Sequence, residues 1–124
     1  MNSGTLYRRS AFTDNPKGGN PAGVWVGETL PSVDVMQRIA TEVGYSETAF
    51  VAPTSGKNRT VRYYSPEIKV PFCGHATIAA GVVLGEIEGD GTYRLATAVG
   101  DVSVTVQSSQ GGVREASLTS VEVE

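Results

Sequence analysis

Three short stretches of this chain carry residue types that could do chemistry. The first is Gly18-Gly19-Asn20-Pro21-Ala22-Gly23, where a tight loop could bring backbone N–H groups and the Asn20 amide to an anion. A structural turn between two strands explains the same residues, because glycine serves turns more often than ligands. The stretch is not a nucleotide-binding fingerprint, since neither its spacing nor its strand-to-helix context fits.

The second stretch is Tyr45-Ser46-Glu47-Thr48-Ala49-Phe50. Glu47 lies between the expected end of a helix and the start of an apolar strand, where a carboxylate is partly shielded from water. Such shielding suits a general acid/base, which must both take and give a proton. A solvated glutamate in a loop is the alternative, and the stretch alone does not separate the two.

The third stretch is Pro71-Phe72-Cys73-Gly74-His75-Ala76-Thr77, which leads into an apolar helix. The free N–H groups of a helix start favour carboxylate or phosphate, and the same positive end favours a thiolate at Cys73. His75 is the only histidine, and a histidine beside apolar residues is often structural. One His and one Cys do not make a zinc site, and two residues apart they are poorly placed to form a hydrolase pair.

The elements that must position these stretches follow from hydrophobic periodicity. Ser32–Val43 is expected to be a helix, capped by Ser32, with Asp34 in its first turn and Gly44 at its end. The expected strands alternate or read as short apolar runs bounded by turn residues, with turns at Pro53–Lys57 and Gly100-Asp101. These strands are Thr5–Phe12, Ala22–Val26, Thr48–Ala52, Thr60–Tyr64, Thr92–Thr97, Val102–Gln107 and Val113–Ser120.

The segment from about His75 to Ile87 has almost no polar face. A helix that is apolar all round is buried all round, so in a domain this small a sheet must cover most of it. The order β-β-α-β-β-α-β-β-β then predicts an α+β fold, a curled mixed β-sheet wrapped around one buried central helix.

Composition bounds the class of protein. The 124 residues fit one domain, with 40% hydrophobic and 19% charged residues and a net charge of −3. Acids and bases are scattered, which argues against nucleic acid as a partner, and no apolar run is long enough for a membrane-spanning helix. A single cysteine cannot form an internal disulfide, and the polar N-terminus does not look like a secretory signal, so we expect a cytoplasmic protein.

Four motifs in this order resemble the phenazine-biosynthesis-F-like (PhzF-like) family. They are Phe12-Thr13-Asp14-Asn15-Pro16, Gly19-Asn20-Pro21-Ala22-Gly23-Val24, Ser46-Glu47-Thr48-Ala49-Phe50-Val51 and Val70-Pro71-Phe72-Cys73-Gly74-His75-Ala76-Thr77. Tyr64-Ser65-Pro66 sits where the family has an aromatic-Thr/Ser-Pro step. The resemblance runs from about Thr5 to Gln107, and four ordered motifs are far more specific than any one of them.

The resemblance implies a diaminopimelate-epimerase-like fold and an isomerase or epimerase (EC 5) that moves a proton on a small carboxylated metabolite, without metal or organic cofactor. It implies that Glu47 is the acid/base and that His75 is a second catalytic residue at the start of the core helix. Asn20, Gly74 and Ala76 would lie on the substrate side. Cys73 lies where related amino-acid epimerases keep a catalytic thiol, and it is taken as an accessory substrate-side residue.

A full family member is roughly twice this length and has its active site between two similar domains. Residues 1–124 therefore resemble a single N-terminal domain whose second domain is absent from this sequence. Three possibilities stay open: a half-site completed by a C-terminal domain, a homodimer that rebuilds the cleft, and a non-catalytic module that binds a small acid or another protein.

Overall fold

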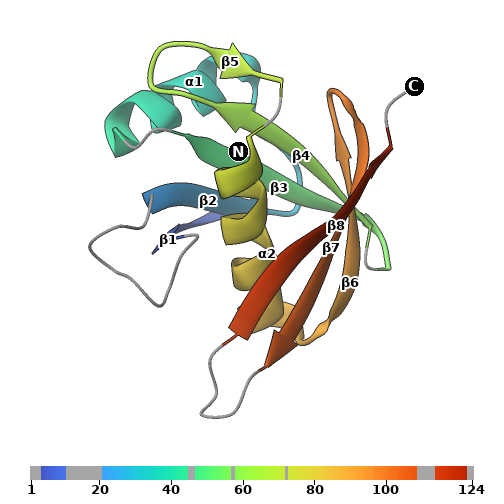
Figure 1. Cartoon of the computed structure of the whole chain (residues 1–124). Helices are drawn as coiled ribbons and strands as arrows, with labels where there is room; N and C mark the ends of the chain where they lie inside the picture. Colours follow the sequence, from blue (N-terminus) through green and yellow to red (C-terminus); the bar gives the residue numbers. More distant parts are fainter. Residues whose placement is uncertain are drawn as a thin grey trace.

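The computed structural model describes residues 4–10, 21–44, 47–56, 58–71, 73–108 and 114–122. The elements follow the chain from the blue N-terminal strands to the red β8 in Figure 1. They are β1 (Gly4–Ser10), β2 (Pro21–Gly27), α1 (Val33–Val43), β3 (Thr48–Ser55), β4 (Asn58–Tyr64), β5 (Lys69–Val70), α2 (Gly74–Glu88), β6 (Gly91–Thr97), β7 (Gly100–Ser108) and β8 (Arg114–Glu122).

All the strands in the described ranges belong to one mixed sheet. Its path runs β1-β2-β3-β4-β6-β7-β8, and the short β5 pairs with β4 beside this path. The β2–β3 and β4–β6 pairs are parallel, whereas β1–β2, β3–β4, β4–β5, β6–β7 and β7–β8 are antiparallel. The predicted mixed α+β architecture is confirmed.

Helix α2 is buried as its sequence predicts. It packs against β1, β2 and β3 at one end of the strand order and against β7 and β8 at the other end (Figure 1). Most of its side chains from Ala76 to Leu84 are inaccessible to water, and Glu86, Ile87 and Glu88 in its last turn are exposed. The curl of the sheet around this helix stays a prediction.

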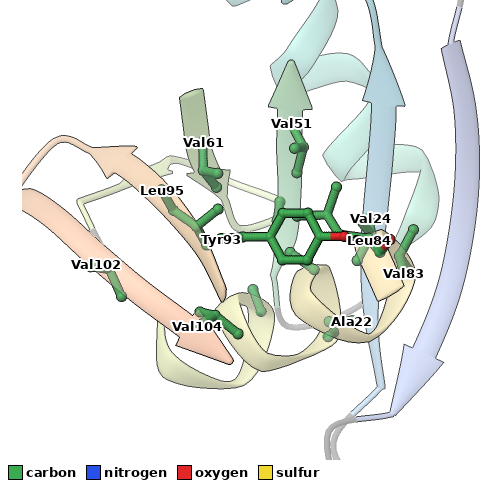
Figure 2. Close-up of a cluster of buried hydrophobic side chains, with 14 of the residues drawn as sticks. Ala22, Val24, Val51, Val61, Val83, Leu84, Tyr93, Leu95, Val102 and Val104 are labelled. Carbon is green, nitrogen blue, oxygen red and sulfur yellow. Dashed lines mark hydrogen bonds between the residues drawn. The ribbon is translucent and has the colours of Figure 1, made fainter. Parts of the chain in front are cut away.

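The two faces of the sheet carry different cores. Val51 of β3 belongs to the cluster around α2, while its neighbour Phe50 belongs to a smaller cluster under α1. This division follows from the strand geometry, in which successive side chains point to opposite faces. Figure 2 shows the larger cluster, including Ala22, Val24, Val51, Val61, Val83, Leu84, Tyr93, Leu95, Val102 and Val104.

Helix α1 begins and ends where the sequence predicts. The Val35 N–H donates to Oγ of Ser32 at 3.3 Å, and Gly44 closes the helix with a φ of 76°. The helix also holds the turn after β4, because Gln37 Nε2 donates to the Ser65 carbonyl at 3.0 Å. In the described part of the chain, no helix is long and apolar enough to cross a membrane.

Two predicted turns are misplaced. Strand β3 continues through Pro53 to Ser55, and the turn is made at Gly56, whose φ of 55° suits glycine. Gly100 and Asp101 are paired within the β6–β7 hairpin rather than forming its turn. That turn is Ala98–Val99, because Thr97 Oγ1 donates to the Gly100 carbonyl at 2.7 Å and accepts from the Val99 N–H at 3.2 Å.

Candidate active site

Two of the predicted site residues meet in the structure. The thiol of Cys73 donates to Oε1 of Glu47, with 3.3 Å between sulfur and oxygen. Glu47 directly precedes β3, and Cys73 is the N-cap residue of α2. The contact therefore joins the second and third sequence stretches at one point, the N-terminal end of the buried helix.

Glu47 is held by the backbone of β2. The Gly23 N–H donates to the Glu47 carbonyl at 3.1 Å, just before the parallel pairing of Gly23 with Thr48. A side chain at position 23 would crowd this junction, since a Cβ there would lie 3.0 Å from Thr48 Oγ1 and 3.2 Å from Val43 Cγ1. Gly23 thus permits the close approach of β2, β3 and the end of α1.

Cys73 is held through its carbonyl. It accepts from the N–H of Thr77 at 3.0 Å and from the hydroxyl of the same residue at 2.7 Å. The backbone of Cys73 is extended, as at most N-caps, but its side chain makes no capping hydrogen bond. Because the thiol turns to Glu47 instead, the first N–H groups of α2 have no side-chain cap from this residue.

A split in the sheet explains how α2 starts beside Glu47. The parallel β4–β6 pairing ends at Thr60 and Ala96, and Arg62 Nη1 then donates to the Ala96 carbonyl at 3.0 Å. Beyond the split, β5 pairs with Tyr63 and Tyr64 of β4. Since α2 follows β5 closely in the chain, the pairing of β5 with Tyr63 and Tyr64 places the start of α2 near this end of β4.

The remaining predicted residues divide into three groups. Gly74 opens α2 and has open space beside it, because a Cβ there would meet no atom within 4 Å. Ala76 is fully buried in the core, so only its backbone could face a substrate. His75 lies in the first turn of α2, but its side chain is outside the described structure, and Asn20 is outside the described residues altogether.

The surroundings of the Cys73 carbonyl are dry. Tyr63 and Thr77 are both fully buried, and their oxygens lie 2.6 Å apart. Burial raises the pKa of Tyr63 to about 12, so this phenol keeps its proton at any physiological pH. Among the described residues, no group of three His, Cys, Asp or Glu side chains could hold a metal ion.

Gly23, Tyr63 and Thr77 also support the site; Gly23 and Thr77 lie in the first and third sequence stretches without a predicted role, and Tyr63 lies outside all three. The alternating burial of β4 gives a signal for Tyr63, which falls on the same face as Val61 and therefore on the side of α2. Thr77 follows Cys73 by four residues, the spacing at which a threonine hydroxyl can reach back to a helix carbonyl. Gly23 carries no comparable signal, because its role depends on a neighbouring strand.

Comparison with known proteins identifies relatives of this chain. The model of a family described as "Phenazine biosynthesis-like protein" matches residues 9–122. A protein named "Uncharacterized isomerase YddE" from Escherichia coli O157:H7 is 39% identical over 111 residues, which cover 88% of this chain and 37% of the relative.

Solved structures agree with the sequence comparison. A PhzF-family phenazine biosynthesis protein of Enterococcus faecalis is 35% identical and superposes with a TM-score of 0.77, covering 86% of this chain and 41% of its own. A hydroxyproline epimerase of Agrobacterium vitis shares the fold at 17% identity and a TM-score of 0.64, covering 83% of this chain and 39% of its own. The chain thus spans about two fifths of the length of these relatives.

Proposed function

Because the chain belongs to the phenazine biosynthesis-like (PhzF-like) family, we propose that it forms half of the active site of an isomerase or epimerase. Its reaction moves a proton on a small carboxylated metabolite, and Glu47 is the acid/base that carries the proton. The proposal needs no metal or organic cofactor. It rests on the family and on one observation, the Glu47–Cys73 contact at the start of α2.

That contact supports the proposed chemistry because it brings an acid/base group to the positive end of a helix. Taking a proton from a carbon beside a carboxylate leaves negative charge on that carbon and on the carboxylate oxygens. Backbone N–H groups at the start of α2, from Gly74 to Ala76, would stabilise this charge as it develops. In an isomerisation Glu47 returns the proton to another carbon, whereas in an epimerisation a second acid on the opposite face supplies the proton.

The other roles in the proposal come from the family. His75 is a second catalytic residue, Asn20 binds the substrate, and Gly74 and Ala76 contribute backbone contacts, with Cys73 as an accessory. The open space beside Gly74 and the complete burial of the Ala76 side chain are compatible with backbone roles for both. A direct measure of each role is the activity of the corresponding variant in a complete enzyme.

A second domain completes the cleft in this proposal. The chain spans 37% to 41% of the relatives compared above, which leaves room in them for another domain of similar size. Its closure would exclude water and strengthen the electrostatic stabilisation. We also propose that the sheet curls around α2, which is supported by the contacts of α2 with both ends of the sheet path. A cytoplasmic location stays a prediction.

The proposal is tested by proton exchange. The chain is combined with its C-terminal counterpart, and deuterium uptake into candidate carboxylated metabolites is followed by NMR. Glu47→Gln should reduce the exchange by about 100-fold or more, the usual contribution of a general acid/base. Exchange that survives Glu47→Gln unchanged would remove Glu47 from this role.

The alternative to a catalytic half-site is a non-catalytic module that binds a small acid or a partner. Ligand-induced stabilisation without turnover, in the presence of the partner domain, is the result expected for such a module. A homodimer that rebuilds the cleft is a variant of the first proposal. Sedimentation that shows a monomer at high concentration contradicts that variant.

A further inference from the structure

We propose that Tyr63 and Thr77 are positioning residues, which hold Cys73 and the first turn of α2 against Glu47 through a directed chain of hydrogen bonds. This inference deepens the proposed function and depends on it for its catalytic meaning. The chain of hydrogen bonds is formed by described residues, and it can be tested without measuring turnover.

The donor and acceptor in each of these hydrogen bonds follow from the protons available. A carbonyl only accepts, so Thr77 Oγ1 donates its single proton to the Cys73 carbonyl at 2.7 Å. The same oxygen must therefore accept from Tyr63, whose hydroxyl lies 2.6 Å away. The order is Tyr63 to Thr77 to Cys73, and both hydroxyls are completely buried.

Tyr63 is well placed to fix the distance between Cys73 and Glu47. It pairs with Ala49 across β3 and β4, so its backbone is tied to the strand that starts directly after Glu47. Its side chain reaches the first turn of α2 on the same face. One residue thus connects the two elements whose ends meet in the 3.3 Å contact between Cys73 Sγ and Glu47 Oε1.

Helix α2 has a matching anchor at its other end, which provides a control. The hydroxyl of Tyr93, on β6, donates to the Gly89 carbonyl at 2.7 Å, where the helix ends. Figure 2 shows Tyr93 crossing the core towards Leu84. Both tyrosines are fully buried. Tyr63 binds the first turn of α2 beside the candidate site, whereas Tyr93 binds the opposite end of the helix.

The test is the rate at which iodoacetamide alkylates the full chain. Cys73 is the only cysteine, so the reaction reports on one thiol. The carboxylate of Glu47 disfavours the reactive thiolate beside it, and Glu47→Gln removes that charge. Glu47→Gln should therefore raise the alkylation rate by about tenfold, because loss of a neighbouring negative charge favours the reactive thiolate.

If Tyr63 acts through this pair, Tyr63→Phe lets Cys73 move away from Glu47 and raises the rate most of the way to that of Glu47→Gln. Thr77→Val should do the same, and Thr77→Ser, which keeps the hydroxyl, should stay at the wild-type rate. Tyr93→Phe removes an equally buried hydroxyl and should leave the rate unchanged. Near-UV circular dichroism checks that each variant is folded. If Thr77→Val does not fold, the comparison of Tyr63→Phe with Thr77→Ser decides the test.

The double variant separates positioning from general loosening. Tyr63→Phe should add nothing in the Glu47→Gln background, because both changes act on one contact. If the two rate increases multiply in the double variant, or if folded Tyr63→Phe reacts at the wild-type rate, the inference is overturned. A wild-type rate in Glu47→Gln also overturns it, since the contact is then not formed in solution. The proton-exchange assay judges the proposed function separately from all these rates.

Discussion

The Cys73 thiol and the Glu47 carboxylate lie 3.3 Å apart although the two residues are 26 positions apart in the chain. Glu47 stands at the start of a strand, Cys73 stands at the start of the buried helix, and each is fixed by its backbone carbonyl. The thiol therefore binds the carboxylate and does not cap the helix.

The missing cap predicts a stability difference at position 73. Serine is a strong N-cap residue, and Cys73 already has the extended backbone that an N-cap needs. We expect Cys73→Ser to be more stable than Cys73→Ala by about 1 kcal/mol in the free energy of unfolding, measured in urea. Equal unfolding midpoints for the two variants would mean that the serine does not cap α2.

Two glycines of α2 should respond to alanine in opposite ways. At Gly74 a Cβ meets nothing, and alanine favours helix, so Gly74→Ala should leave stability unchanged or raise it by up to about 1 kcal/mol. At Gly81 a Cβ would lie 2.6 Å from Val104 Cγ1 and 3.0 Å from Ala116 Cβ. Gly81→Ala should therefore lower stability by about 1–3 kcal/mol despite its better helix propensity. Thermal unfolding of both variants checks this pair, and a stabilised Gly81→Ala would contradict the close packing of α2 on β7 and β8.

The ion pair at the far end of α2 should matter more than an exposed pair elsewhere. Arg59 is only 3% exposed and binds Glu88, while its Nη1 donates to the Gly56 carbonyl at 2.7 Å. Removing the carboxylate leaves a buried guanidinium without its counter-charge, so Glu88→Ala should cost about 1–3 kcal/mol.

The matched control for that change is Asp101→Ala. Asp101 pairs with Arg94 at 3.4 Å, and both side chains are about half exposed, whereas Arg59 is buried. Exposed pairs contribute little, so this variant should change stability by less than about 0.5 kcal/mol. Urea unfolding of both variants in one buffer compares them, and equal losses would show that burial of Arg59 is unimportant.

Alkaline pH should weaken the fold through Tyr63. Burial raises the pKa of Tyr63 to about 12 from its ordinary value of 10.0, so the folded state holds this proton more tightly than the unfolded state. Its contribution is complete below pH 10 and is lost as pH rises towards 12, at up to about 1.4 kcal/mol per pH unit.

Tyr63→Phe should flatten this part of the stability profile. Some dependence should remain, because burial also raises the pKa of Tyr64. The slope of the unfolding free energy against pH is measured by urea unfolding at pH values from about 9 to 11, on both sides of the ordinary tyrosine pKa. An unchanged slope in the variant would mean that Tyr63 ionises as freely in the folded chain as in the unfolded one.

The sequence alone predicted the elements whose signals are local. Hydrophobic periodicity, the Ser32 cap and Gly44 defined α1, and the apolar surface of the segment from His75 to Ile87 defined the buried helix. The order of four motifs indicated the family, which the match over residues 9–122 confirms. The hairpin turns were less predictable, because Thr97 closes its turn with a side-chain hydrogen bond that glycine spacing does not reveal.

The sequence determined which residues were candidates, and the tertiary structure decided which of them meet. Cys73 and Glu47 come together because β4 parts from β6 and pairs with β5 close to the start of α2. Tyr63 reaches that site from the neighbouring strand β4. Position 81 suits glycine because a Cβ there would collide with a methyl group of Val104. Such long-range contacts leave no periodic trace in the chain, since they depend on how strands pair and how a helix packs upon them.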